Sequence, residues 1–581
     1  MSLSSALTIA TSSLKATQTA ISVTSNNIAN ADVAGYTRKT VAPQTVIVSG
    51  LGNGVSLAEI QRQVDAGLEK RTNAARTQSA EALIIAAYLD QLQSAYGSTT
   101  GDDTIATKIG DLSSSLQALS TSPASDSDAQ KVISDLADLA DTANGLTDSI
   151  QDLRQEADQS IADSVAAVNA ALHNLDELNN QVMRAQATGV STADLVDQQM
   201  QQIAALSEQF NISYFTNANG AVSVYGPGGV PLLTDNVHEL SFTPTSPIDA
   251  TTLYDPASST GLSGVSVGGQ DITGFIGSGL MSGLFTVRDE TLVAEQKLVD
   301  NLSAGILDAV NAAQNAGTSV PAPNSLTSSE PITGTDALNG SGTLRVALLD
   351  ADGNVQSYAD LDLSLYATND DLVAGLDAIP GLSAGYDADG KLVITSDDPN
   401  LGVGLGQISG GVGASNETLS AALGLNDVMV RSADGKLSVR SDIATDPALL
   451  ARGSLSTEAT LAIGSKGVAS GDASAVNAMI DNLAADRTFP GGGGMATATT
   501  DIASYAANLI AHVAVSASEA EASAEIKAGT LSSLESSLAG KSGVNLDEET
   551  AELSLLETNY QAAAKVVSVV QEMYKTLLNM I

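Results

Sequence analysis

The stretch that decides the fold is residues 553–581, which read LSLLETNYQAAAKVVSVVQEMYKTLLNMI. Apolar residues recur there at alternating spacings of three and four positions: Leu553, Leu556, Tyr560, Ala563, Val567, Val570, Tyr574, Leu577 and Ile581. This spacing places them on one side of a helix, as in a seam that packs along a second helix. The stretch therefore predicts a long helix that needs a helical partner.

The opposite end of the chain offers such a partner. The same alternation recurs at Leu3, Leu7, Ala10, Leu14, Thr17, Ile21, Thr24 and Ile28. Two matching seams at the two ends predict a coiled-coil pair through which the protein assembles. Periodicity alone is equally compatible with two ordinary amphipathic helices of one globular core.

Composition restricts the class of partner. The chain has 581 residues, a length typical of three or four domains, and a formal net charge of −42. Such an acidic chain is a poor binder of nucleic acid, which requires a basic surface over the phosphates. Residues 1–80 carry seven Lys or Arg against four acids, so a mildly basic end adjoins a strongly acidic remainder.

Cysteine usage and hydropathy restrict the cellular context. The chain has no Cys, which excludes a disulfide framework and a thiolate metal site. The first charge after Met1 is Lys15, so a cleaved signal peptide is not expected. No run approaches the roughly 20 apolar residues of a membrane helix, and we expect no membrane insertion.

The interior alternates between helical and strand-like patterns. Helical patterns extend over residues 58–96, 105–119, 126–187, 192–210, 279–316 and 496–538. The longest has an uninterrupted apolar stripe: Val132, Leu136, Leu139, Leu146, Ile150, Leu153, Ile161, Val165, Val168, Leu172, Leu175 and Leu178. Asp126 or Asp128 can cap it, and Gly540 with Gly543 can act as a hinge before the terminal seam.

These patterns predict a mainly α fold with β-rich insertions. We expect a terminal coiled-coil assembly domain from residues 1–57 and 541–581, and a long-helix layer from 58–210, 275–316 and 496–540. A β-hairpin insertion occupies 211–274, with a turn at Asn219-Gly220, and an outer β-rich domain occupies 317–495.

No motif in the chain supports catalysis or cofactor binding. The turns at 350–353, 387–390 and 432–435 contain Asp-Gly, which favours hairpin turns over calcium loops in a strand context. Two Gly-x-Ser-x-Gly matches, at 264–268 and 381–385, lack a strand-to-helix setting. His173, His238 and His512 have no metal-ligand spacing. We therefore expect no catalytic, cofactor or metal site, and no enzyme.

The residues after the first seam carry a recognisable motif. Residues 25–39 contain Ser25, Asn26, Asn27, Asn30, Gly35 and Tyr36. This stretch resembles the N-terminal signature of the rod, hook and hook-associated proteins of the bacterial flagellum. Before the second seam, Gly543, Val544, Asn545 and Leu546 are similar to the C-terminal signature of that family, in the form typical of hook-associated proteins. Asn545 or Asp547 can cap the last helix there.

The resemblance continues into the interior, over roughly residues 1–320 and 455–581. Residues 194–199 and 279–289 resemble hook-associated patterns, which simple rod and hook subunits lack. Gln199-Met200 departs from the Arg-Asp pair expected there, so a salt bridge at that position is absent.

The resemblance implies a structural subunit at the junction between hook and filament. It implies self-association in a ring, hook protein on one side, and a second junction protein and the filament on the other. It further implies an extracellular place in the flagellum, type III export without a cleaved signal, and an export chaperone at the C-terminal helix. The alternatives are a hook or filament subunit, or a flagellum-borne surface adhesin or enzyme with its activity in residues 320–495.

Overall fold

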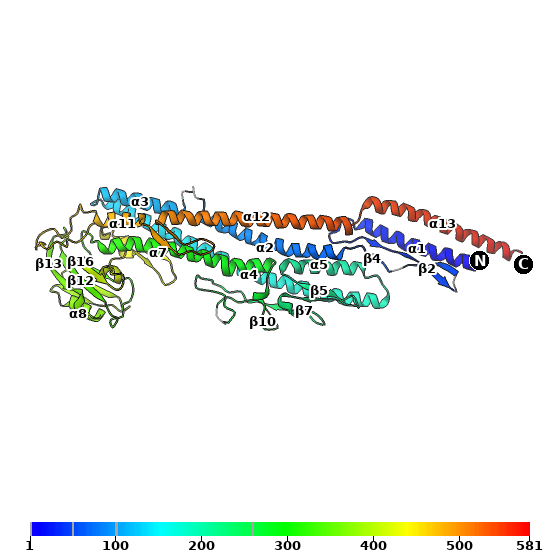
Figure 1. The fold of residues 1–581 in the computed structure, drawn as a ribbon, viewed down its shortest axis with the longest axis horizontal. Helices are drawn as coiled ribbons and strands as arrows, with labels where there is room; N and C mark the ends of the chain where they lie inside the picture. The colour runs from blue at the N-terminus through cyan, green and yellow to red at the C-terminus, as the bar shows by residue number, and fades with distance from the viewer. Residues whose placement is uncertain are drawn as a thin grey trace. The chain divides into compact units, whose positions relative to one another are not determined.

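The computed structural model describes residues 3–48, 51–57, 59–98, 101, 103–257 and 261–580 (Figure 1). Contacts divide the chain into two compact units. Unit one contains Met1–Tyr88, Arg154–Asp289 and Ser518–Ile581, and unit two contains Leu89–Leu153 and Glu290–Ala517. The prediction of a mainly α fold with β-rich insertions is confirmed. The finer four-part division stays a prediction.

Helices account for most of the regular structure. The α-helices are α1 (Leu3–Ala29), α2 (Ala66–Tyr96), α3 (Ile105–Thr121), α4 (Asp126–Thr188), α5 (Ala193–Gln209), α6 (Leu280–Phe285), α7 (Leu292–Ala316), α8 (Asn369–Asp377), α9 (Leu419–Leu423), α10 (Ser441–Thr445), α11 (Ser474–Ala484), α12 (Ile502–Ser542) and α13 (Leu546–Leu578). A π-helix, Thr286–Thr291, lies between α6 and α7. Short 3-10 helices are η1 (Pro227–Gly229), η2 (Thr273–Phe275), η4 (Leu363–Leu365) and η5 (Pro447–Leu449).

The sheets of unit one are small and antiparallel. Their strands are β1 (Lys39–Thr40) with β4 (Gln61–Arg62), β2 (Pro43–Val48) with β3 (Leu51–Leu57), β5 (Ser213–Thr216) with β6 (Val222–Tyr225) and β7 (Pro231–Leu233), and β8 (Leu240–Ser241) with β9 (Ser266–Val267) and β10 (Gln270–Asp271). The hairpin predicted around Asn219-Gly220 is confirmed as β5–β6.

The sheets of unit two are larger and also antiparallel. Their strands are β11 (Ser325–Thr327), β15 (Leu392–Ser396) and β14 (Leu382–Tyr386); β13 (Val355–Asp362), β12 (Gly340–Leu349) and β16 (Gly402–Val412); β17 (Met429–Arg431) with β18 (Leu437–Val439); and β19 (Arg487–Phe489) with β20 (Ala498–Thr500). The three predicted Asp-Gly turns join β12 to β13, β14 to β15, and β17 to β18. Their glycines, Gly353, Gly390 and Gly435, have positive φ, which a hairpin turn of this kind requires.

The long helix α4 follows its sequence pattern closely. All twelve residues of the predicted apolar stripe are buried, because a helical repeat brings them to one side. The cap, however, is not Asp126 or Asp128. The helix begins at Asp126, and the Ser125 hydroxyl accepts a hydrogen bond from the Asp128 amide at 3.3 Å.

Other helix boundaries differ from the sequence prediction. The helix predicted from residue 58 begins at Ala66, because residues 39–62 form strands β1–β4 and the Asp65 carboxylate accepts the Leu68 amide. Two of its expected inward residues, Val64 and Leu83, are exposed. The helix predicted over 279–316 is interrupted by the π-helix, and Gly540 lies inside α12 rather than at a hinge. The segment predicted as an outer β-rich domain, residues 317–495, also contains helices α8–α11, which its Gly-rich sequence did not indicate.

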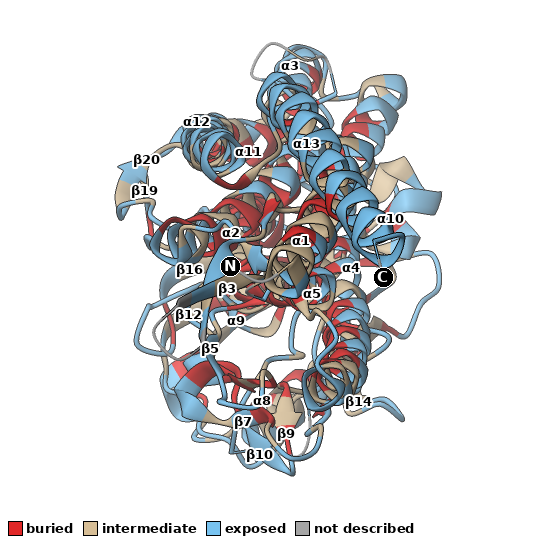
Figure 2. Cartoon of the chain, turned by 90° about the vertical axis from the view of Figure 1, so that its right-hand side faces the viewer, coloured by how far each residue is buried: buried red, intermediate tan, exposed pale blue. Residues whose placement is uncertain are grey.

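Each unit has a core of its own kind. In unit one, α1 packs along α13 and against β3. Helices α2, α4 and α5 each contribute buried residues to this unit (Figure 2). In unit two, a cluster that includes Leu344, Leu372 and Ile394 lies between the strands and α8. Within the described ranges, every helix is too short or too polar to cross a membrane.

Candidate assembly site at the chain ends

The two helices that carry the predicted seams pack together in unit one. Helices α1 and α13 lie side by side, with the N- and C-terminal ends of the chain at the same end of the pair (Figure 1). On α1 the small seam residues Ala10, Thr17 and Thr24 are buried. The larger ones are half-buried: Leu3, Leu7, Leu14, Ile21 and Ile28.

The seam of α13 is covered less completely than that of α1. Val570 is buried, and the half-buried members are Leu553, Leu556, Ala563 and Val567. Tyr560, Tyr574 and Leu577 are exposed, and Ile581 lies outside the described residues. Helix α1 therefore covers only part of the predicted seam.

A second apolar stripe runs beside the seam of α13. It consists of Leu555, Val566, Val569, Met573 and Met580, each one residue before a seam position, and all of them are exposed. We call this set the outer stripe. Figure 2 shows the contrast, with α13 mostly exposed and α1 mostly half-buried or buried. Apolar residues at helical spacing that water still reaches mark a surface for packing.

The N-terminal signature folds around one buried amide, that of Asn27. Its Nδ2 donates to the Lys39 carbonyl and to Glu549 Oε2, both at 2.9 Å. Its Oδ1 accepts from the Lys39 amide and from the Tyr36 hydroxyl, both at 3.0 Å. Asn27 thus uses its full hydrogen-bonding capacity and joins the turn after α1 to the first turn of α13.

Arg38 and Glu549 form an ion pair in the joint between the turn after α1 and the first turn of α13. Arg38 Nε donates to Glu549 Oε1 at 2.6 Å, and the Glu549 side chain is almost fully buried. The Arg38 amide donates to the Ser542 carbonyl at 2.8 Å, where α12 ends. Asn545 is the cap of α13, because its side chain accepts from the Asp547 and Glu548 amides. The end of α12 and the start of α13 are therefore both held by the N-terminal signature.

Lys39 links the same turn to α5. Its Nζ lies 2.8 Å from Asp194 Oδ1 and 2.8 Å from Asp197 Oδ2, and 3.3 Å from the centre of the Tyr36 ring. Burial by itself lowers the pKa of Lys39, but hydrogen bonds to the two carboxylates outweigh burial and raise the pKa. Lys39 therefore stays charged, and two carboxylates of the interior motif at 194–199, Asp194 and Asp197, balance its charge.

Asp197 is shared by a second cation. Its Oδ1 accepts from Arg62 Nε at 2.6 Å and from the Thr37 hydroxyl at 2.7 Å. Burial raises the pKa of Tyr36, with the neighbouring Lys39 partly opposing the rise. These buried ion pairs have their hydrogen bonds satisfied, the condition under which buried charges are tolerated.

The remaining signature residues have backbone or surface roles. Gly35 has a φ of +76°, and a Cβ there would meet the Gln201 side chain. Asn30 donates to the Asn26 carbonyl at 2.8 Å and so ends α1. Gly543 and Val544 are half-buried between α12 and α13, whereas Ser25, Asn26, Asn545 and Leu546 are exposed.

The interior motif at 279–289 contributes to the core of unit one. Arg288 is fully buried, forms ion pairs with Asp158 and Asp289, and donates to the Ser263 carbonyl. Gln199 is also fully buried and donates to Asn179 Oδ1 at 2.8 Å, so an amide contact replaces the expected ionic one.

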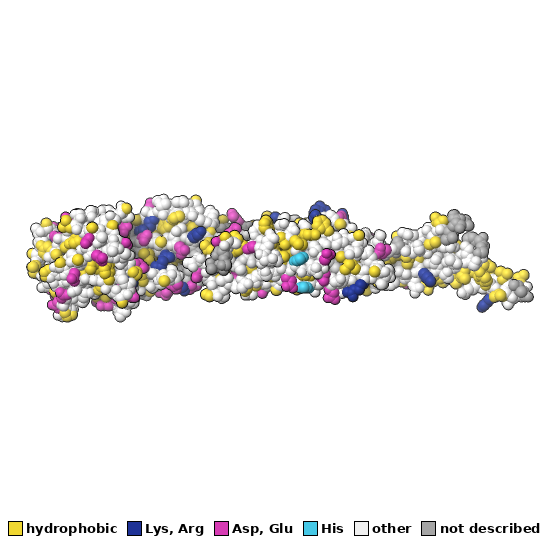
Figure 3. Space-filling view, turned by 90° about the horizontal axis from the view of Figure 1, so that it is seen from below, with side chains coloured by type: hydrophobic (Ala, Val, Ile, Leu, Met, Phe, Trp, Pro, Cys, Tyr) yellow, Lys and Arg dark blue, Asp and Glu magenta, His cyan; other side chains and the backbone are white. Residues whose placement is uncertain are grey.

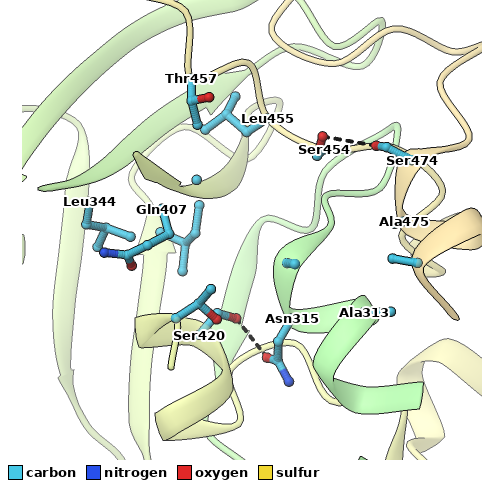
Figure 4. A pocket seen from close by; sticks show the side chains of 15 residues that line it. Ala313, Asn315, Leu344, Gln407, Ser420, Ser454, Leu455, Thr457, Ser474 and Ala475 are labelled. Atoms are coloured by element: carbon cyan, nitrogen blue, oxygen red, sulfur yellow. Dashed lines mark hydrogen bonds between the residues drawn. The ribbon is translucent and has the colours of Figure 1, made fainter. Parts of the chain in front are cut away.

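Unit two contains a pocket of about 320 Å³, between α7, α9, α11 and the β12–β16 sheet (Figure 4). It is lined by amides, hydroxyls and aliphatic side chains. Ser420 donates to Asn315 Oδ1 at 2.7 Å, and Ser474 donates to Ser454 Oγ at 3.0 Å. The fifteen lining residues include neither His nor any charged residue, so the pocket holds no nucleophile–base pair. Among the described residues there is also no metal-ligand cluster.

Sequence reasoning missed the charged members of the joint: Arg38, Lys39, Asp197 and Glu549. The available signals were that Arg38 and Lys39 lie within the N-terminal motif of residues 25–39, and that Asp197 lies within the interior motif at 194–199. Their carboxylate partners lie 158 and 511 residues away. Contacts over such separations cannot be deduced from a single sequence.

Comparisons with known proteins agree with this arrangement. The protein-family model described as "Flagella basal body rod protein" matches residues 7–37, and the family model described as "Flagellar basal body rod FlgEFG protein C-terminal" matches residues 539–580. Between them, "Flagellar hook-associated protein FlgK helical domain" matches residues 89–324. Flagellar hook-associated protein 1 of Salmonella typhimurium is 24% identical over an alignment 605 positions long, which covers 99% of this chain and all of that protein. Over nearly its whole length, the chain is therefore similar to flagellar hook-associated proteins.

Other hook-associated proteins match in part. Flagellar hook-associated protein 1 of Escherichia coli is 26% identical over 54% of this chain and 58% of its own length. The solved structure of the flagellar hook junction protein FlgK from Burkholderia pseudomallei is 17% identical, with a TM-score of 0.47 over 80% of this chain and 99% of that chain. The resemblance found in the sequence is confirmed, and this hook-associated protein is a structural component of the flagellum.

Proposed function

We propose that the protein assembles through α1 and α13 as the junction between hook and filament. The observation that carries this proposal is the α1–α13 pair, which leaves the outer stripe of α13 in water. Full burial of a large apolar side chain contributes about 1.5–3 kcal/mol relative to full exposure, and these five side chains are still 38–82% exposed, so packing against further subunits is favourable. The role is structural and involves no catalysis.

The partners follow from this position. Hook protein lies on one side, and a second junction protein and the filament lie on the other, with copies of this chain forming the layer between. The protein is exported without a cleaved signal and acts outside the cell. Because the outer stripe is exposed before assembly, an export chaperone that covers α13 would prevent premature association.

A charge placed in the outer stripe tests the proposal. Val566 is exposed in the α1–α13 pair, so Val566→Asp leaves the monomer folded. In the assembled layer the new carboxylate would be buried without a partner, which costs several kcal/mol in every subunit. We expect cells that carry Val566→Asp to build hooks, to lack filaments and to release flagellin into the medium, as seen by electron microscopy and immunoblotting.

Ser568→Asp is the matched control, because it adds the same charge two residues away on the exposed polar side of α13. These cells are expected to swim normally. Normal filaments on Val566→Asp cells would show that the outer stripe is not the joint. Absence of hooks would assign the protein to an earlier step, as a hook subunit.

A further inference from the structure

Unit two contains a hairpin whose tip consists largely of glycine. Strands β19 and β20 are joined by residues 490–497, which read PGGGGMAT, and we call these residues the glycine tip. Gly493 and Gly494 have positive φ, and most of the tip is exposed. Glycine loses more conformational entropy on ordering than any other residue, so the tip stays closed only where other elements hold it.

The glycine tip closes over helix α7. A Cβ added at Gly492 or Gly493 would lie within 4 Å of Leu298, whose side chain is fully buried. A Cβ added at Gly493 would also lie 3.6 Å from Glu295 Oε1. The tip therefore shields an apolar and an acidic side chain of α7 from water.

His512 on α12 links the glycine tip to Glu295. Its Nε2 lies 3.0 Å from the Gly493 carbonyl oxygen and 3.4 Å from Glu295 Oε1. A carbonyl oxygen only accepts, so Nε2 carries the proton in this contact. An ionised Glu295 competes with Gly493 for that N–H, because hydrogen bonds to a charged acceptor are the stronger ones. A protonated Glu295 competes far more weakly.

Two tyrosines and His512 are the titratable groups that face Glu295. Tyr96 from α2 donates to Glu295 Oε2 at 3.4 Å, and Tyr505 from α12 interacts with it electrostatically. Burial raises the pKa of both tyrosines, so both stay neutral near pH 7. The glycine tip itself has no ionisable side chain. Burial also raises the pKa of Glu295, from 4.5 to about 7.

We propose that the glycine tip acts as a pH-sensitive strap, which is closed when Glu295 is protonated and opens when Glu295 ionises. With the tip open, water reaches the carboxylate and the pKa of Glu295 returns toward 4.5. Closing therefore raises the affinity of Glu295 for its proton. The closed form keeps its full advantage below about pH 4.5 and loses it as pH rises through about 7. This inference concerns unit two alone and does not rest on the proposed function.

Thiol labelling beneath the glycine tip tests this proposal, because the chain has no Cys of its own. Leu298→Cys places a thiol under the closed tip, and Ala294→Cys places one a turn earlier on α7 without removing a core side chain. In the full-length protein, the labelling rate is divided by that of a free cysteine peptide at the same pH, which corrects for thiol ionisation. We expect this ratio to rise about tenfold from pH 6 to pH 8 in both variants. A constant ratio would overturn the proposal.

Substitutions of the two partners assign the response to one of them. In the Leu298→Cys background, Glu295→Gln is expected to keep the ratio constant within about twofold. His512→Gln retains an N–H donor and is expected to preserve the rise. The opposite pattern would show that His512 titrates instead, and would overturn the proposal.

An exposed pair in unit one provides the control. Figure 3 shows histidine side chains at the surface with acidic side chains beside them. His173 and Glu239 form a pair of this kind, 2.7 Å apart, with 57% and 61% of their side chains exposed. Glu239→Gln removes a carboxylate that water already solvates, so the rise should remain about tenfold. Loss of the rise in this variant would overturn its assignment to Glu295.

Discussion

At the scale of single residues, buried polar groups hold the chain ends in place. The Asn27 amide contacts a carboxylate 522 residues away and uses all its hydrogen-bonding positions. Removing one member of such a network leaves a buried charge or amide without a partner, and this loss costs more than the contact itself contributes. The assembly site therefore depends on Asn27, Arg38 and Glu549 together, although none of them belongs to an apolar seam.

A second buried carboxyl, Glu295 on α7, gives unit two a pH dependence. Burial raises its pKa from 4.5 to about 7, and the hydrogen bond from the Tyr96 hydroxyl partly opposes the rise. Folded Glu295 therefore binds its proton more tightly than the unfolded chain does. The free energy of unfolding falls as pH rises from about 4.5 to about 7, by about 3 kcal/mol at most, and stays lower above that range. We expect Glu295→Gln to be more stable than the wild type at pH 8 and to flatten this dependence.

Urea denaturation followed by circular dichroism at pH 5 and pH 8 measures the effect. Glu290→Gln serves as the control, because Glu290 is exposed on the adjoining π-helix and should leave the pH dependence unchanged. A Glu295→Gln protein that loses stability between pH 5 and pH 8 as the wild type does would show that another group is responsible. His512, whose Nε2 lies 3.4 Å from Glu295 Oε1, would be the next to substitute.

At the scale of elements, the joint between α12 and α13 decides the direction of the last helix. Helix α12 ends at Ser542 and α13 begins at Leu546, so only three residues lie between them. Asn545 caps the new helix, and the Ser542 carbonyl accepts the Arg38 amide. The joint is therefore held by hydrogen bonds, and α13 is directed along α1.

Substitutions at two nearby glycines distinguish the role of the α12–α13 joint from that of helix α12. At Gly540 nothing lies within 4 Å of an added Cβ, so Gly540→Ala should stabilise α12 by about 0.5–1 kcal/mol. At Gly543 a Cβ would lie 2.4 Å from the Ala539 carbonyl oxygen, so Gly543→Ala must shift the joint. We expect a higher thermal midpoint for Gly540→Ala, and a lower midpoint with impaired swimming for Gly543→Ala. Equal behaviour of the two variants would contradict a specific role for Gly543.

At the scale of the whole molecule, the outer segment is not a simple appendage. Helix α11 packs on α7 and α3, and Phe489 stacks on Tyr505 with ring centres 3.8 Å apart. These late residues of the segment cover the helices of unit two. The earlier residues have a separate core, which includes Leu344, Leu372 and Ile394.

Two deletions distinguish these parts. Replacing residues 330–423 by a short Gly-Ser linker is sterically simple, because the Ser329 amide already donates to the Gly424 carbonyl at 3.1 Å. We expect that protein to keep its helical circular dichroism and a cooperative thermal transition. Deleting residues 317–495 uncovers α7 and Tyr505, and should lower the thermal midpoint sharply. Identical melting of the two proteins would show that α11 and Phe489 contribute little.

The amino-acid sequence by itself determined what depends on neighbours along the chain. The twelve-residue stripe of α4, the β5–β6 hairpin and the Asp-Gly turns were all predictable, because each is encoded within a few turns or strands. The joint of Arg38, Lys39, Asp197 and Glu549 was decided only by tertiary structure, because its members lie more than 150 residues apart and pair through the fold. The exposure of the outer stripe of α13 could likewise not be predicted from the sequence, because it depends on which side of α13 is covered by α1.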